Sequence, residues 1–101
     1  MVTHIVFFRM HPEAAGATGE ENARRLVEQL RALPDKIDVL VNLEAGTDFS
    51  QTPASYDVGL ITRFHSREDL ETYRVHPDHQ KVVKFVQETT SDRAVVDYEN
   101  P

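Results

Sequence analysis

The sequence of 101 residues predicts a single α+β domain with the element order β-α-β-β-α-α-β and a four-stranded antiparallel sheet. Two observations lead to this prediction. Four segments are rich in β-branched and aromatic residues, which favour strands, and three segments place apolar residues at helical spacing. The order matches the ferredoxin-like split βαβ arrangement, in which helices cover one face of the sheet. The length suits one compact domain, residues 1–101, with no room for a second.

The first predicted strand is Val2–Met10, which carries apolar side chains on both faces. Ile5 and Phe7 lie on one face. The opposite face carries His4, Val6, Phe8 and Met10. A strand of this kind is usually covered on both sides. Residues 11–19, HPEAAGATG, are small and rich in glycine, and they predict a loop.

The first predicted helix covers Glu20–Leu33, because apolar residues recur at helical spacing while Glu and Arg fill the other side. The apolar residues are Ala23, Leu26, Val27, Leu30 and Leu33. Pro34 ends this helix, since proline disfavours helical geometry in the residue before it. Ile37–Ala45 alternates in polarity and predicts the second strand. Residues 46–55 follow as a ten-residue loop, long enough to act as a flap.

Tyr56–Phe64 is the third predicted strand. Ser66 then opens a second helix, with Asp69 three residues later as its capping-box partner. Leu70 and Tyr73 share the inner face of this helix.

Pro77 predicts a break and the start of a third helix, because the first helical turn tolerates a missing N–H. This helix runs to about Thr90, and Ala94–Glu99 is the fourth predicted strand. His76 then lies outside the helix, near its cap, whereas His79 lies inside it. His79 shares an apolar stripe with Val82, Val83 and Val86. The two histidines do not share a helix face, so no joint metal site is expected.

Helices on one face of the sheet leave the other face uncovered, and Ile5 and Phe7 belong to that face. A contiguous apolar patch seldom stays exposed in a soluble monomer. Pairing two sheets back to back into one barrel would bury the patch and protect the edge strands. We therefore expect a homodimer.

The composition excludes several classes of protein. Acidic residues outnumber basic residues 17 to 11, giving a net charge of −6, and no basic run is present, so nucleic-acid binding is not expected. The chain has no cysteine, which excludes disulfides, thiol nucleophiles and Cys-ligated zinc. No stretch approaches the ~20 apolar residues of a membrane span, and the N-terminus does not resemble a signal peptide. We expect a cytoplasmic protein without membrane contact.

His79 has two interpretations. It is either a core histidine satisfied by a backbone carbonyl or a tyrosine, or a general base in a pocket between helices and sheet, because burial and neighbouring groups can bring an imidazole close to neutral pH. His4 shares its strand face with Val6 and Phe8, so it enters the same apolar space if that face meets the helices. Tyr73 could reach this space too, and together the three form a plausible acid–base set.

The remaining titratable residues suggest structural roles. His11 and His65 are predicted to be solvated. Asp57 and Asp97 lie within apolar strands, and each could pair with Arg63 or Arg93, a structural ion pair being favoured over a catalytic acid. No glycine-rich phosphate loop and no serine nucleophile elbow is present.

Four segments carry a family resemblance, namely HIVFFRM, SYDVGLITRF, YRVHPDHQKVVKF and DRAVVDYE. Together they resemble the stress-responsive A/B barrel (Dabb) domain over Val2–Glu99. The resemblance implies ferredoxin-like monomers that dimerise into an α+β barrel. The family is functionally mixed, and it includes plant stress proteins and bacterial members without an assigned activity. The related haem-degrading and quinone-forming monooxygenases share the barrel, but this sequence gives no support for their site residues.

One branch of the family consists of polyketide cyclases, which close a poly-β-keto chain by intramolecular aldol condensation. By resemblance, His79 would be the general base, and His4 and Tyr73 would orient or polarise the substrate oxygens, without metal or organic cofactor. Leu26 stands where that branch has a second tyrosine. We therefore expect a dimer that binds a small apolar ligand between helices and sheet, with a cofactor-free cyclase-like enzyme acting on a polyketide-like substrate as the alternative. The expected ligand-binding residues are Val6, Phe8, Leu26, Leu30, Val83 and Val86.

Overall fold

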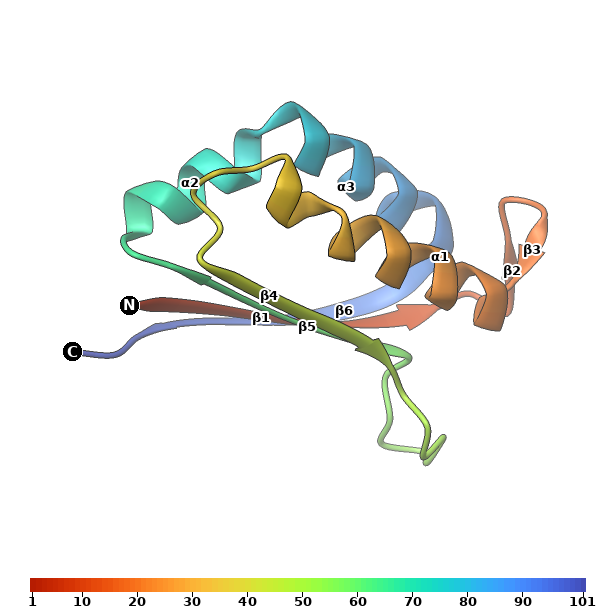
Figure 1. Cartoon of the computed structure of the whole chain (residues 1–101). Coiled ribbons are helices and arrows are strands. Elements are labelled where there is room, and N and C mark those ends of the chain that lie inside the picture. The colour runs from red at the N-terminus through yellow and green to blue at the C-terminus, as the bar shows by residue number, and fades with distance from the viewer.

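The computed structural model describes the whole chain, residues 1–101 (Figure 1). Three helices and a 3₁₀ turn are distributed among six strands. In chain order the elements are β1 (Val2–Met10), β2 (Glu13–Ala14), β3 (Ala17–Thr18), α1 (Gly19–Arg31), η1 (Leu33–Asp35), β4 (Asn42–Thr47), β5 (Val58–Phe64), α2 (Arg67–Val75), α3 (Pro77–Thr89) and β6 (Thr90–Glu99).

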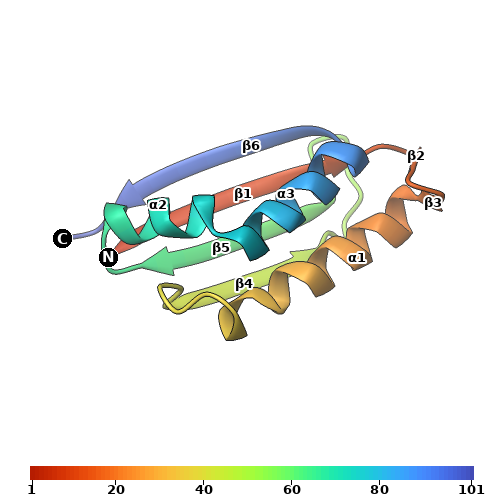
Figure 2. The ribbon, with the colours of Figure 1, turned by 90° about the horizontal axis from the view of Figure 1, so that it is seen from above.

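The main sheet has four antiparallel strands in the order β4-β5-β1-β6. The three helices all lie on one face of it (Figures 1 and 2). This confirms the predicted ferredoxin-like α+β fold. The last strand in the chain, β6, pairs with the first, β1. Their register places His4 opposite Asp97 and Phe8 opposite Arg93. Cross-strand partners point to the same face, so Asp97 and Arg93 lie on the side of the helices.

The core fills the space between the helices and the sheet. It is a single cluster of 17 buried apolar residues. The β1 residues Val6, Phe8 and Met10 belong to it, as the alternation predicts. Leu26 and Leu30 of α1 are 0% and 1% exposed and pack onto this layer. No helix is long and apolar enough to cross a membrane.

The helix starts follow local capping rules. The Ser66 hydroxyl accepts a hydrogen bond from the backbone N–H of Asp69 at 3.1 Å, so Ser66 is the N-cap of α2, as predicted. Pro77 is the first residue of α3, which also agrees with the prediction. His76 is the N-cap of α3, and its Nδ1 accepts a hydrogen bond from the Asp78 N–H at 3.1 Å. This contact gives His76 a structural role away from His79.

The segment predicted as the strand Ile37–Ala45 is wrong in its first half. After α1 the chain makes the 3₁₀ turn η1 and further turns, and β4 begins only at Asn42. Ile37 is 1% exposed because its side chain packs into the core from the segment that follows η1. A buried residue in a turn contributes the same apolar pattern as a residue in a strand, which explains the error.

Other boundaries moved by a few residues. The predicted loop 11–19 contains the small hairpin of β2 and β3, whose turn uses positive φ at Ala15 and Gly16. The helix α1 ends at Arg31 rather than at Leu33. The strand β6 starts at Thr90, four residues before the predicted Ala94, because it continues directly from α3.

The sheet face opposite the helices is open (Figure 1). Phe7 is 45% exposed there, and Val96 and Tyr98 of β6 are 57% and 42% exposed. The Phe7 ring packs at 6.0 Å from the Tyr56 ring, and the Arg9 guanidinium lies 4.3 Å above the centre of Tyr56. We call this surface, defined by Phe7, Tyr56, Val96 and Tyr98, the open face.

Candidate functional site

A cavity of about 360 Å³ lies between α3 and the strands β1 and β6. Both His4 and His79 line it. The residues predicted to contact a ligand that do line it are Val6, Phe8, Leu30, Val83 and Val86. Leu26 lies outside the cavity wall, fully buried in the core. The side chains of Arg74, Gln80 and Arg93 complete the polar part of the wall.

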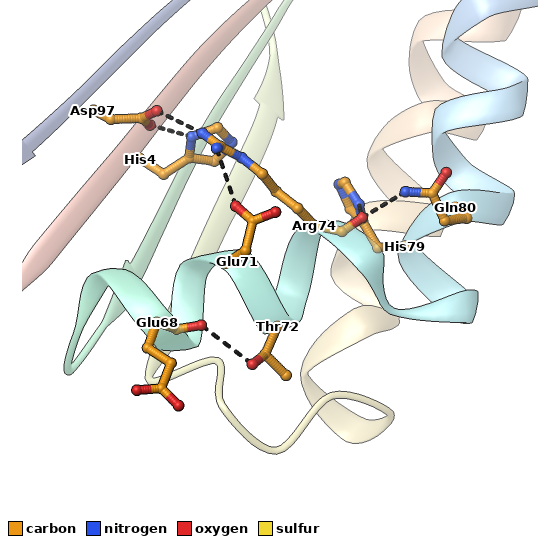
Figure 3. Close-up of polar contacts among 8 residues, drawn as sticks. All are labelled: His4, Glu68, Glu71, Thr72, Arg74, His79, Gln80 and Asp97. Carbon is orange, nitrogen blue, oxygen red and sulfur yellow. Dashed lines mark hydrogen bonds and ion pairs between the residues drawn. The ribbon is translucent and has the colours of Figure 1, made fainter.

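His79 is half-buried in the first turn of α3, and one of its ring nitrogens is fixed by the backbone. Its Nδ1 lies 3.0 Å from the carbonyl oxygen of Arg74 (Figure 3). A carbonyl oxygen only accepts hydrogen bonds, so Nδ1 carries the proton. In the neutral ring, Nε2 therefore holds a free lone pair, the form that a general base requires.

The electrostatic surroundings of His79 favour its neutral form. Burial lowers the pKa of His79 below its usual value of 6.5, because a charged ring loses hydration there. The backbone contact with Arg74 opposes this shift, whereas the nearby charges of His4, Arg74 and His76 add to it. His79 is thus unprotonated over a wider pH range than a solvated histidine.

His4 of β1 is 8% exposed, and a residue of the neighbouring strand β6 fixes the orientation of its ring. Its Nδ1 donates a hydrogen bond to a carboxylate oxygen of Asp97, directly across the strand pair. This contact leaves Nε2 of a neutral His4 without a proton as well. The second carboxylate oxygen of Asp97 accepts a hydrogen bond from the Arg74 guanidinium at 2.8 Å.

Arg74 therefore contacts His79 directly and His4 through Asp97 (Figure 3). Its backbone carbonyl accepts hydrogen bonds from His79 and from the Gln80 side chain. Its guanidinium holds Asp97, which in turn holds His4. Glu71 pairs with the same guanidinium at 3.4 Å. One residue at the end of α2 thus sets the orientation of two imidazoles that come from different elements.

Tyr73 packs beside both histidines but does not line the cavity. Its ring centre lies 4.2 Å from that of His79 and 6.3 Å from that of His4. The side chain is 0% exposed, and its hydroxyl is buried without a hydrogen-bond partner. Burial raises the pKa of Tyr73, so the phenol remains protonated. Its position supports the His79 ring from behind.

Sequence reasoning missed the polar residues around the histidines. Asp97 and Asp57 were expected to pair with Arg63 or Arg93, and this expectation is wrong. Asp97 contacts His4 and Arg74, and a carboxylate oxygen of Asp57 accepts the backbone N–H of Met10 at 2.7 Å. Only the pairing of β1 with β6 brings Asp97 to His4, and a sequence without known register gives no signal for it.

None of the other main hollows brings two histidines together. A larger hollow of about 640 Å³ lies against the sheet, beside the open face and the loop of Phe49, and no histidine lines it. No cluster of three or more His, Asp or Glu side chains could hold a metal ion. The chemistry-bearing residues therefore concentrate in the smaller cavity.

Comparisons with known proteins agree with this architecture. The stress-responsive A/B barrel domain family matches residues 2–100. An uncharacterized protein of Streptomyces coelicolor is 30% identical over 98% of this chain and 99% of its own length. A stress-response A/B barrel domain-containing protein of Arabidopsis thaliana is 29% identical over 97% of this chain, which spans about half of that protein, 46%.

A solved structure from Bacteroides fragilis is also similar. It is described as a dimeric protein of unknown function with a ferredoxin-like fold. The TM-score is 0.84 with 31% identity, and the match covers 98% of this chain and 95% of the other.

Proposed function

This chain belongs to the stress-responsive A/B barrel domain family, and we propose that it acts as a homodimer that binds a small, largely apolar molecule between its helices and its sheet. The observation that carries this proposal is the cavity of about 360 Å³, in which eight apolar residues surround two oriented imidazoles. Small-molecule sites typically measure about 300–1,000 Å³. The absence of cysteine fits a cytoplasmic location, where we place the protein.

The open face supports the homodimer. Phe7, Val96 and Tyr98 present apolar surface that a second sheet would bury. The Bacteroides fragilis protein, similar over nearly its full length, is dimeric. Light scattering should therefore give about twice the chain mass of 11.5 kDa. A stable species at the chain mass would contradict the dimer.

A cavity-filling variant tests ligand binding. Val83 lines the cavity and is only half-buried, so Val83→Phe should fill the space with little strain. Wild-type protein screened by thermal shift against apolar carbonyl compounds should gain stability with some of them, and Val83→Phe should not. Val75→Phe is the matched control, because Val75 is 65% exposed and outside the cavity. Equal shifts in wild type and Val83→Phe would place binding elsewhere.

A second candidate function is cofactor-free proton transfer, as in the polyketide-cyclase branch. The observation that favours it is the Nε2 lone pair of His79, together with the lowered pKa of this ring. An α-proton between two carbonyls is acidic enough for a neutral imidazole to remove. Neutral His4 can then accept a hydrogen bond from a substrate hydroxyl, such as that of an enol, through its own Nε2. Tyr73 would hold His79 in place and would not touch the substrate.

Deuterium exchange at C3 of a linear β-diketone, 2,4-nonanedione, tests this chemistry, because C3 lies between the two carbonyls. Wild type should accelerate exchange over buffer, and His79→Ala should lose about 10²–10⁴-fold of that acceleration while remaining folded. His65→Ala is the control, because His65 is an exposed histidine outside the cavity. Full acceleration in His79→Ala would show that His79 is not the base.

A further inference from the structure

The cavity differs in charge from the rest of this acidic protein. The chain carries 17 acidic residues, yet no Asp or Glu lines the cavity. Each of the other four main hollows has at least one carboxylate in its wall. The charged residues in the wall of this cavity are two arginines, Arg74 and Arg93. The wall of this cavity therefore presents no carboxylate, and the nearest one described, Asp97, is occupied by His4 and Arg74.

The two arginines are in different states. Arg74 is neutralised by Asp97 and Glu71. Arg93 takes part in none of the seven ion pairs of the protein. The polar contact of Arg93 is made by its backbone, whose N–H donates to the carboxylate of Asp92 at 2.9 Å, and its guanidinium forms no hydrogen bond. The guanidinium of Arg93 is thus an uncommitted cation beside an apolar space.

The positions along β6 give the cavity a polarity. Arg93 lies opposite Phe8 at one end, Val95 lies opposite Val6 in the middle, and Asp97 lies opposite His4 at the other end. Asp97 follows Arg93 four positions later along the strand, a backbone distance of about 13 Å. From one end of the cavity to the other, the wall thus changes from the guanidinium of Arg93 to aliphatic side chains and then to the imidazoles of His4 and His79.

We propose that the ligand of this cavity is a carboxylate-bearing amphipath, with its carboxylate on Arg93 and its apolar chain directed toward His4 and His79. This inference rests on the proposed ligand-binding function and adds the chemical class of the ligand. A guanidinium binds a carboxylate through two parallel hydrogen bonds. A single uncommitted arginine matches one monoanion, whereas a dianionic phosphate would call for more positive charge.

Calorimetric titration with decanoate and with 1-decanol tests this assignment, because the two probes differ in charge and share their apolar chain. Wild type should bind decanoate at least tenfold more tightly than decanol. Arg93→Gln should lose about tenfold in decanoate affinity and leave decanol unchanged, as expected for one charge-assisted pair. Arg25→Gln is the matched control, since Arg25 is exposed on α1, takes part in no ion pair and lies outside the cavity.

Failure of this inference and failure of the proposed function give different results. Equal affinity for both probes, unaffected by Arg93→Gln but abolished by Val83→Phe, would overturn the carboxylate assignment and leave the apolar cavity function intact. No binding of either probe, or binding that survives Val83→Phe, would overturn both. A loss in Arg25→Gln equal to that in Arg93→Gln would show only a general charge effect and would also overturn the assignment.

Discussion

The two faces of the sheet differ in cover and in chemistry. The helix side holds the buried core and the cavity, with two histidines fixed by hydrogen bonds. The open face holds exposed aromatic and aliphatic side chains, with Phe7 against Tyr56 as its main contact. Alternate residues of the same strand serve both faces, since His4 and Val6 point one way and Phe7 the other. One strand thus supplies both a cavity wall with a histidine and an exposed apolar surface.

The largest expected effect is on stability, which should depend far more on the core residues between helices and sheet than on exposed residues. Leu26→Ala should lower the free energy of unfolding by about 2–5 kcal/mol, because it leaves a cavity in a fully packed core. Urea denaturation at one fixed protein concentration measures this, since dimerisation contributes to apparent stability. Phe49→Ala, at a residue 95% exposed, should change it by less than about 0.5 kcal/mol. Similar losses in both variants would contradict the difference in packing.

The open face should matter for assembly. Phe7→Asp places a charge in the centre of the apolar surface, so the dimer should dissociate about 30-fold or more readily, a cost of about 2 kcal/mol. Light scattering across a dilution series measures the dissociation constant. Val75→Asp, on an exposed residue of α2, should leave it unchanged. A dimer that resists Phe7→Asp would show that this face is not the interface.

Removing one polar contact on each face of the sheet should give a smaller difference in stability. Asp97→Asn should cost about 1–2 kcal/mol, because Arg74 loses its charged acceptor and His4 loses the carboxylate that fixes its proton on Nδ1. The ¹⁵N chemical shifts of His4 should then move toward a mixture of tautomers. Tyr56→Phe, which removes an exposed 3.3 Å hydrogen bond to Asp92, should cost less than about 0.5 kcal/mol. Unchanged ¹⁵N shifts would mean that Asp97 does not orient the ring.

The smallest expected effect is the pH dependence contributed by His79. Its folded pKa is lower than 6.5, so the unfolded chain binds more protons as pH falls, and stability decreases from about pH 6.5 down to the folded pKa. The loss is about 1.4 kcal/mol for each unit by which the two pKa values differ. Urea denaturation at pH 8 and pH 5 should show a smaller difference for His79→Gln than for wild type. An equal difference in both proteins would contradict the lowered pKa.

The sequence predicted the elements whose apolar period is long and regular. Val2–Met10 has nine residues of strong strand character and forms β1 within those bounds. Pro77 marks the start of α3 because its ring suits only the first turn. The strand assigned from Ile37 was wrong because a core contact made by a turn has the same polarity pattern as a strand. Local sequence does not distinguish the two when the long-range partner is unknown.

The candidate site was predictable in its apolar wall and its histidines but not in its polar links. The positions of His4 and His79 follow from strand and helix periods, which are local. The contacts of Asp97 with His4 and Arg74 depend on the pairing of β1 with β6, at a separation of 93 residues between His4 and Asp97. Hydrogen bonds at such separation follow from register, which is set by the whole sheet.

The double role of Arg74 has a consequence for sequence change. The carbonyl that holds His79 belongs to the backbone, so any residue at position 74 that keeps the helix end can supply it. The guanidinium that holds Asp97 is lost with almost any substitution. Divergence at this one position would therefore preserve the hydrogen bond of His79 while removing the cation that holds Asp97, the partner of His4. Position 74 is a point at which the charge of the cavity wall can change while the contact of His79 is kept.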